Sequence, residues 1–248
     1  WREQPMAPFE PLPVDRDSAR AILDAAEPGY LDEDRALAVL RAYGLSAPEF
    51  KLCATADEAA AFADSIGYPV VLRVVSPQIV HKYDVKGVAL DLRGPDAVRA
   101  AYEEMIAHVR RALPGAGIRG VVCRGMIPSG AEVILGAKRD AVFGGTIMFG
   151  LGGLFVEVYH DVTFALAPID RAAAGRMVRE VRAHRILEGA RGRPPADIAS
   201  IEQCLVRLGQ LVTDFERISE LDINPLIVHP AGSGSAVADV RIRLGGGD

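Results

Sequence analysis

Two apolar segments joined by a polar connection make up the stretch "VVLRVVSPQIVHKYDVKGVALDL", residues 70–92. The ends are rich in valine and leucine, which is typical of core strands. The connection carries His81, Lys82, Asp84 and Lys86, and it closes at Gly87. The chain has only five histidines, and this one stands beside lysines between two buried strands. The stretch therefore predicts a strand–loop–strand unit with a candidate functional site in the loop.

The regions on either side of this stretch alternate between helical and strand-like patterns. Residues 55–67 begin with Thr55 and Glu58 at capping-box spacing and end at a glycine, so a helix is expected there. Further helices are expected at 32–44, 94–115, 171–184 and 198–213, and strands at 119–127, 131–138, 145–153, 155–168, 219–228 and 235–244. Strands that occur both in runs and between helices predict an α+β or mixed α/β chain with two lobes.

Composition sets limits on the class of protein. The 248 residues are 50% hydrophobic, enough for one large domain or two lobes, and the net charge of −5 argues against a nucleic-acid surface. Three scattered cysteines lack the spacing of a metal site or a disulfide framework, so a reduced, cytoplasmic chain without a membrane partner is expected. Residues 1–30 hold five prolines and one short helical stretch. They are expected to form a linker from an upstream domain.

The C-terminal part, "SELDINPLIVHPAGSGSAVADVRIRL", reads as a hairpin. Asp222 and Asn224 are two residues apart on one strand, so their side chains leave the same face. If the turn lies near residues 231–232, Asp239 on the partner strand comes roughly opposite Asn224. Two carboxylates and an amide oxygen suit Mg²⁺ carried by a nucleotide. Polar side chains that simply meet solvent are the alternative, and the spacing alone leaves both open.

Several stretches together resemble a known family. In order, they are "YPVVLRVVSPQIVHKYDVKGV", "AEVILGAKRDAVFG", "IMFGLGGLFVEVYHDVTFALAPI", "GARGRPPADI" and "LDINPLIV…AVADVRI". They resemble the ATP-grasp (beta-subunit-like) half of ADP-forming acyl-CoA synthetases, of the succinyl-CoA synthetase superfamily, over roughly residues 31–244. The resemblance implies an ATP-grasp fold whose two lobes hold a nucleotide between them. The smaller lobe would cover about 51–127, and the larger about 128–248 plus the 31–48 helix.

The resemblance also implies an activity and its site residues. The expected reaction is acyl-CoA + ADP + phosphate ⇌ acid + CoA + ATP, with Mg²⁺ as cofactor and a CoA-binding half, fused or separate, as partner. His81 matches a histidine that carries the phosphoryl group, and Asp222 matches the acidic residue that supports it. Asn224 and Asp239 match magnesium ligands. The expected nucleotide-binding residues are Arg73, Lys82, Gly87, Arg124, Gly125, Met126 and Glu132, with Glu132 holding the ribose and residues 123–126 lying along the adenine edge.

Three positions depart from the family pattern. Arg73 stands where a lysine is usual, Lys86 replaces a loop glycine, and Gly125 replaces a hinge glutamate. Such changes suit an alternative function, a catalytically weakened regulatory domain fused to a protein acetyltransferase. The presence of His81, Asp222, Asn224 and Asp239 together favours the enzyme.

Overall fold

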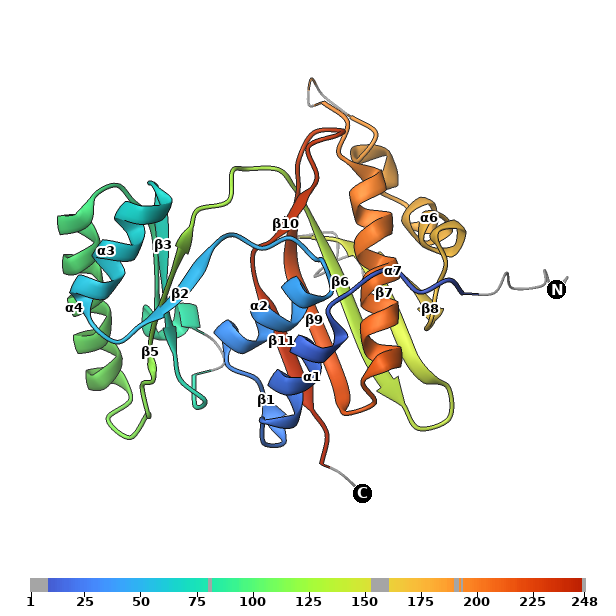
Figure 1. The fold of residues 1–248 in the computed structure, drawn as a ribbon. Coiled ribbons are helices and arrows are strands. Elements are labelled where there is room, and N and C mark those ends of the chain that lie inside the picture. Colours follow the sequence, from blue (N-terminus) through green and yellow to red (C-terminus); the bar gives the residue numbers. More distant parts are fainter. Residues whose placement is uncertain (1–8, 80–81, 153–160, 190–191, 193, 247–248) are drawn as a thin grey trace, which may run out of the picture. The chain divides into compact units, whose positions relative to one another are not determined.

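The computed structural model describes residues 9–79, 82–152, 161–189, 192 and 194–246 (Figure 1). The chain divides into two compact units. Unit 1 comprises Trp1–Gly29, Ala38–Ala47 and Ser129–Asp248, and unit 2 comprises Tyr30–Leu37 and Pro48–Pro128. Helix α2 (Glu33–Ala42) contributes its first residues to unit 2 and the others to unit 1. The expected larger lobe took the whole of this helix, whereas the structure divides it.

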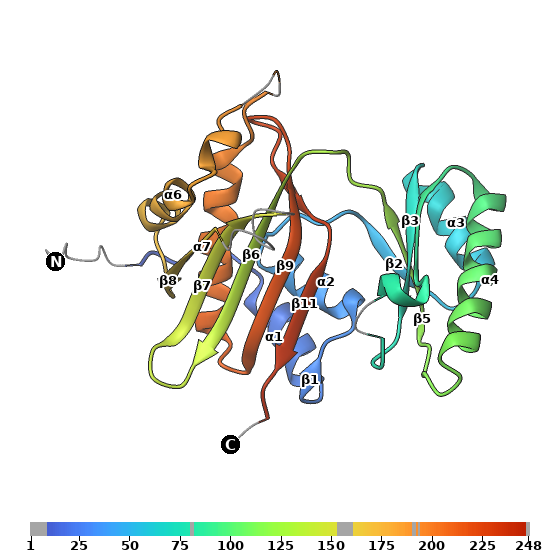
Figure 2. The ribbon, with the colours of Figure 1, turned by 180° about the vertical axis from the view of Figure 1, so that it is seen from behind.

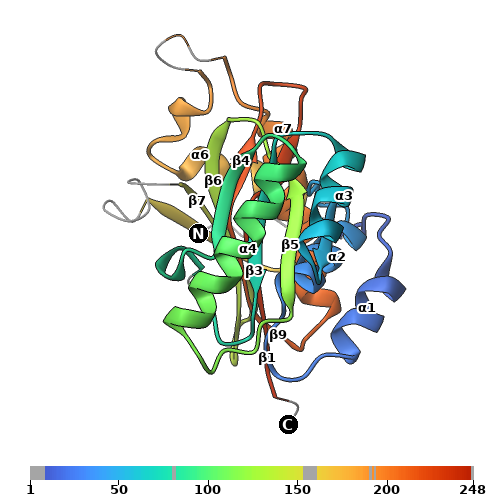
Figure 3. The same cartoon turned by 90° about the vertical axis from the view of Figure 1, so that its left-hand side faces the viewer.

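Unit 2 is a four-stranded antiparallel sheet with two helices on one face (Figure 3). The strand order is β2 (Phe50–Cys53), β5 (Gly120–Gly125), β3 (Val70–Val75) and β4 (Val88–Leu92). The helices are α3 (Ala56–Ile66) and α4 (Pro95–Ala112). Thr55 Oγ1 accepts a hydrogen bond from Glu58 N at 3.2 Å, and Glu58 Oε2 accepts one from Ala54 N at 2.9 Å. The predicted helix start is confirmed, with the cap side chains arranged nearly as in a capping box.

Strand β3 is buried along its whole length, and its two faces have different surroundings. Val70, Leu72 and Val74 join the core formed with α3 and α4. Arg73 alternates with these residues and therefore points to the other face, where it is only 5% exposed. The all-apolar pattern of a core strand is thus interrupted by one buried charge.

Unit 1 is built on a larger antiparallel sheet (Figures 1 and 2). Its strand order is β1 (Gly29–Tyr30), β11 (Val240–Leu244), β9 (Ile218–Val228), β6 (Ala131–Asp140), β7 (Gly144–Leu151) and β8 (Val162–Leu166), with β10 (Ser235–Val237) also paired to β9. Helix α7 (Ile198–Asp214) packs on one face of the sheet, and α6 (Arg171–Glu180) packs beside it. Figure 2 shows the sheet from the side turned away from α7.

The C-terminal hairpin has the predicted partners but one strand more than expected. β10 pairs Val237 with Leu226, and β11 pairs Val240 with Ile223, so the register is the same in both. Between them, Asn224 N donates to Asp239 O at 3.1 Å and Ala238 N donates to Pro225 O at 3.0 Å. Pro225 has no N–H group to donate in return. The single strand expected at 235–244 is therefore wrong, because the ladder is interrupted opposite this proline.

Residues 9–29 fold onto unit 1, with helix α1 (Arg16–Asp24) burying Ala19 and Leu23. The α7 residue Gln210 is 4% exposed, and its side chain accepts from Leu12 N at 2.9 Å and donates to Leu12 O at 3.1 Å. Arg217 donates to Leu23 O and Ala26 O at 2.8 and 3.0 Å. The segment expected to be a linker is therefore held by specific bonds over this range. That it follows a CoA-binding half stays a prediction.

Candidate functional site

The polar side chains of the C-terminal hairpin gather on one face of the unit 1 sheet. Leu221 and Ile223 of β9 are 1% and 0% exposed, so Asp222 and Asn224 leave the opposite face. Asp239 precedes the buried Val240 and pairs with Asn224. The structure thus brings together the three residues as predicted. We call this surface the polar face, and its residues are Gly136, Lys138, Glu220, Asp222, Asn224, Asp239, Arg241 and Arg243.

Charges alternate across the strands of the polar face. Asp222 lies between Gly136 of β6 and Arg241 of β11, and Glu220 lies between Lys138 and Arg243 in the next row. Burial raises the pKa of Asp222, while Arg241 lowers it and the carboxylates of Asp239 and Glu220 raise it further. Arg241 is therefore the cation that favours the ionised form of Asp222. Arg241 was not predicted from the sequence, although its spacing of two residues from Asp239 could have placed it on this face.

A hollow of about 230 Å³ lies over this part of the sheet. It is lined by Gly136, Ala137, Lys138, Thr146, Met148, Phe164, Glu220, Leu221 and Asp222. Gly136 pairs with Asp222, and a Cβ built at Gly136 would lie 3.1 Å from the end of the Met148 side chain. A larger residue at Gly136 would therefore intrude where the hollow meets Asp222.

The donor set beside this hollow fits magnesium. Asn224 and Asp239 present an amide oxygen and a carboxylate from paired positions, and Asp239 Oδ1 also accepts from Val240 N at 3.0 Å. Mg²⁺ usually keeps several waters and takes one or two protein carboxylates plus phosphate oxygens. Among the described residues, no cluster of three His, Cys, Asp or Glu could hold a metal ion. The pair therefore suits an ion that arrives with a phosphate ligand better than a closed structural site.

In unit 2 the predicted arginines share the face of the sheet turned away from α3 and α4. Arg73 pairs with Val122, and Arg124 pairs with Val71. Arg124 is 4% exposed. Arg73 Nε lies 2.9 Å from each carboxylate oxygen of Glu33, at the start of α2. Glu33 was not predicted from the sequence, because nothing local links a helix start to a strand residue forty positions later.

The expected adenine-edge segment already uses two of its backbone donors. Gly125 N donates to Glu49 O at 3.3 Å, and Met126 N donates to Pro69 O at 3.0 Å. The side chain of Met126 is 40% exposed. A base at this segment would therefore contact carbonyl oxygens or side chains, since both of these N–H groups are engaged.

The structure describes the loop between β3 and β4 only in part. His81 lies outside the described residues, and Lys82 begins the short 3₁₀ helix η1 (Lys82–Val85). Gly87 is buried, and its carbonyl accepts from Val74 N at 2.9 Å. Lys86 has φ +50°, a left-handed conformation that favours glycine. The glycine usual in the family at this position would thus adopt this backbone without strain, whereas the lysine does not.

Glu132 stands at the exposed start of β6, paired with Ile227. Its carbonyl accepts from Gly152 N at 2.8 Å. A Cβ built at Gly152 would lie 3.1 Å from both the Cβ and the carbonyl oxygen of Glu132. Gly152 thus has a packing role, because it lets the end of β7 approach the backbone that carries Glu132.

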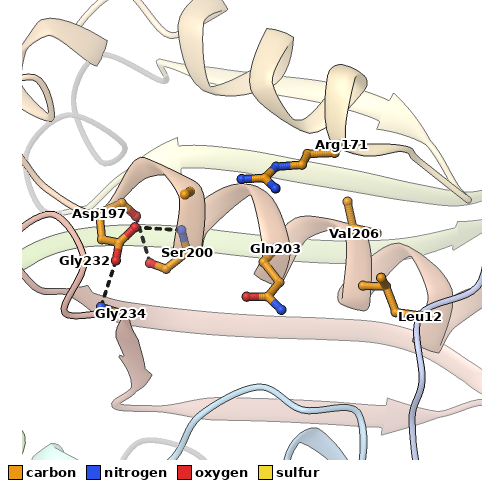
Figure 4. Close-up of a pocket in the computed structure, with 9 residues that line it drawn as sticks. Leu12, Arg171, Asp197, Ser200, Gln203, Val206, Gly232 and Gly234 are labelled. Carbon is orange, nitrogen blue, oxygen red and sulfur yellow. Dashed lines mark hydrogen bonds between the residues drawn. The ribbon is translucent and has the colours of Figure 1, made fainter.

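A second pocket of unit 1, about 440 Å³, lies along α7 and contains none of the predicted site residues (Figure 4). Asp197 accepts from Ser200 N at 3.0 Å as the cap of α7 and from Gly234 N at 2.9 Å. Arg171 is paired with Glu202 at 3.2 Å. Asp197 thus caps α7 and fixes the turn at Gly234, and Arg171 links α6 to α7. The charged side chains of this pocket therefore have structural roles.

Similarity to known proteins identifies the family of this chain. Residues 23–244 match the model of the ATP-grasp domain family. The chain belongs to the ATP-grasp family. It is 46% identical over 215 residues to the acetate–CoA ligase (ADP-forming) II subunit beta of Pyrococcus furiosus, with 86% of this chain and 91% of that protein covered. Within the ATP-grasp family, the domain is thus the beta-type half of an ADP-forming acyl-CoA synthetase, which is only part of the enzyme.

Longer relatives contain this ATP-grasp domain as one part. It is 45% identical over 234 residues to acetate–CoA ligase (ADP-forming) I of Archaeoglobus fulgidus, covering 94% of this chain but only 34% of that protein. A solved acetyl-coenzyme A synthetase 1 of Ca. Korarchaeum cryptofilum is 39% identical, with a TM-score of 0.80 and coverage of 93% and 100%. That structure holds coenzyme A and Mg-AMPPCP, with its phosphohistidine segment pointing towards the nucleotide-binding site. These relatives do not support the alternative of a regulatory acetyltransferase module.

The described part of the ATP-grasp domain contains no helix that is both long and apolar enough to cross a bilayer.

Proposed function

We propose that this ATP-grasp domain binds Mg²⁺ with ADP or ATP and transfers a phosphoryl group through His81. Together with a CoA-binding half it would catalyse acyl-CoA + ADP + phosphate ⇌ carboxylic acid + CoA + ATP. The observation that carries the proposal is the pairing of Asn224 with Asp239 beside Asp222, in a chain 46% identical to a ligase beta subunit.

The proposed site residues have different roles, which follow from the chemistry of their side chains. Asn224 and Asp239 would hold the Mg²⁺, which when bound neutralises charge on phosphate oxygens. Arg73, Lys82, Gly87, Arg124, Gly125, Met126 and Glu132 are the proposed nucleotide-binding residues. Arginine suits phosphate because its planar fork donates two parallel hydrogen bonds.

His81 would carry the group in two balanced displacements. A ring nitrogen of neutral His81 attacks the phosphorus of a phosphohistidine on the CoA-binding half. The new P–N bond forms as the old one breaks, and the electron pair returns to the donor imidazole. An oxygen of the ADP β-phosphate then attacks, the P–N bond to His81 breaks, and ATP forms. Asp222 would accept the other ring N–H of His81 and fix its tautomer.

The test is transfer of label from γ-labelled ATP and Mg²⁺ to the protein, detected as acid-labile, base-stable label. His81→Ala should abolish the label, and Asp222→Asn should slow its formation while nucleotide binding is kept. His108→Ala is the matched control, because His108 is a partly exposed histidine on α4 of the same unit. Label that forms equally well without His81 would refute the proposed carrier. Absence of label even with the CoA-binding half present would refute the phosphohistidine route.

A further inference from the structure

Arg241 stands at a specific position on the polar face. Its strand neighbours Val240 and Ile242 are 4% and 0% exposed, so Arg241 points to the opposite side, the side of Asp222 and Asn224. It pairs with Asp222. It is therefore one row from the Asn224–Asp239 pair, the proposed metal ligands.

Arg241 differs in burial from the other cations of the polar face. It is half-buried, whereas Lys138 and Arg243 are exposed and flank Glu220 from either side. No hydrogen bond or ion pair within 4 Å joins the Arg241 guanidinium to any residue that the structure describes, so it acts on Asp222 through its charge alone. By contrast, Arg73 of unit 2 is fully engaged at Nε by Glu33.

A guanidinium in this position can have either of two roles. It can offset the negative charge of Asp222, Asp239 and Glu220, which requires no direct bond. Alternatively, it can hold its donors ready for an anionic ligand that the face itself does not supply. The second role explains why the guanidinium remains unbonded to described residues despite three nearby carboxylates, since a simple charge-offsetting arginine gains most by forming an ion pair.

We propose that Arg241 is a phosphate-binding residue of this face, donating hydrogen bonds to oxygens of the di- or triphosphate chain of the bound nucleotide. The inference rests on the proposed function, because it needs a nucleotide whose metal is held by Asn224 and Asp239. It adds an arginine of β11 to the proposed nucleotide-binding residues.

The two roles predict opposite results for Arg241→Met, which keeps the aliphatic part of the side chain. If Arg241 binds phosphate, Arg241→Met weakens Mg·ADP and Mg·ATP binding by roughly tenfold or more, the effect of losing a hydrogen bond to a charged group. Adenosine binding stays unchanged. If Arg241 only offsets carboxylates, its loss leaves a more negative face, which binds Mg²⁺ alone and Mg·ADP as tightly as before or more tightly.

The experiment is calorimetry on the 248-residue chain with Mg²⁺ alone, Mg·ADP, Mg·ATP and adenosine. Arg243→Met is the matched control, because it removes the next exposed arginine of the same strand face, opposite Glu220. Arg241→Lys should lie between wild type and Arg241→Met, since lysine keeps the charge without the planar fork. Thermal unfolding of each variant checks that it is folded.

Three outcomes would overturn the assignment of Arg241. They are unchanged or tighter Mg·ADP binding in Arg241→Met, equal loss of ADP and adenosine affinity, and equal effects of Arg241→Met and Arg243→Met. Wild-type chain that binds no nucleotide would overturn the proposed function and this assignment with it. If one of the three outcomes occurs while the wild-type chain still binds nucleotide, only the assignment of Arg241 is withdrawn and the proposed function stands.

Discussion

Arg73 and Glu33 form a buried ion pair inside unit 2, with side chains only 6% and 2% exposed. The pair joins strand β3 to the first turn of α2 through a guanidinium nitrogen 2.9 Å from both carboxylate oxygens. A buried pair of this kind is costly to break on one side, because the remaining charge has no compensation.

Arg73→Ala should therefore lower the free energy of unfolding by about 3–5 kcal/mol, the usual cost of breaking a buried ion pair. The double variant Glu33→Leu/Arg73→Met should recover most of this loss, since it removes both charges and keeps apolar volume. Urea unfolding of the two variants measures the difference. Equal losses in both would show that the uncompensated charge of Glu33 is not the cause of the destabilisation. Nucleotide affinity of the double variant, once folded, then reports whether Arg73 also contacts phosphate.

Asp239→Asn should reduce the Mg²⁺-dependent part of ADP affinity on the order of tenfold, because it replaces an anionic ligand by a neutral one. The asparagine oxygen can still accept from Val240 N, so the local backbone should be kept. Calorimetry with and without Mg²⁺ gives the comparison. Glu220→Gln is the control, because it changes a carboxylate on the same face that is not a proposed ligand. If both variants act alike, the effect is general electrostatics.

Lys86→Gly should raise the free energy of unfolding by roughly 0.5–1 kcal/mol. Glycine relieves the left-handed strain at φ +50° but also gains freedom in the unfolded chain, which cancels part of the benefit. Lys86→Ala removes the same charge without relieving the backbone, so it should give no gain. A stabilisation shared by both variants would trace to charge rather than to backbone conformation. Thermal or urea unfolding decides between them.

Cys123 provides a pH-dependent test of the unit 2 core. Burial raises the pKa of this thiol to about 12, with a further contribution from Cys53. Its folded pKa lies above the reference value of 9.0. The neutral thiol therefore makes its full contribution to the free energy of unfolding below pH 9, and this contribution is lost as the pH rises toward 12. In this range the free energy of unfolding should fall by up to about 1.4 kcal/mol per pH unit, the value for one proton.

The measurement is urea unfolding between pH 7.5 and pH 10.5. Cys123→Ala should be less stable at neutral pH but should lose less stability on the alkaline side. Val121→Ala truncates another buried residue of β5 without a titratable group, so its curve should run parallel to that of the wild type. If the Cys123→Ala curve is parallel as well, the thiol is not responsible for the alkaline loss.

The features that the sequence predicted correctly depend on neighbouring residues. The cap of α3 needs only Thr55 and Glu58, and the register of the last hairpin follows from a turn whose centre can be read from Pro, Gly and Ser. Once that register is known, Asn224 and Asp239 must meet. The polar face was therefore predictable from one strand pair.

The features that escaped prediction depend on contacts between distant segments. Glu33 reaches Arg73 only because α2 returns to a strand forty residues later, and no local pattern records such a partner. The interruption of the last strand comes from Pro225 on the strand opposite, so it cannot be seen within residues 235–244 themselves. Likewise, the apolar residues of 16–26 predict a helix but not the surface that receives it.

The bonds between Leu12 and Gln210 join residues 198 positions apart, which constrains when this part of the molecule can form. At a synthesis rate of roughly 5–20 residues per second, the ribosome needs about 10–40 s to reach Gln210 after making Leu12. Throughout that interval α1 has no α7 to bind. Unit 1 should therefore complete its folding only after α7 has been synthesised. Ribosome-bound chains of increasing length would show protease protection of α1 only after Arg217 has left the exit tunnel.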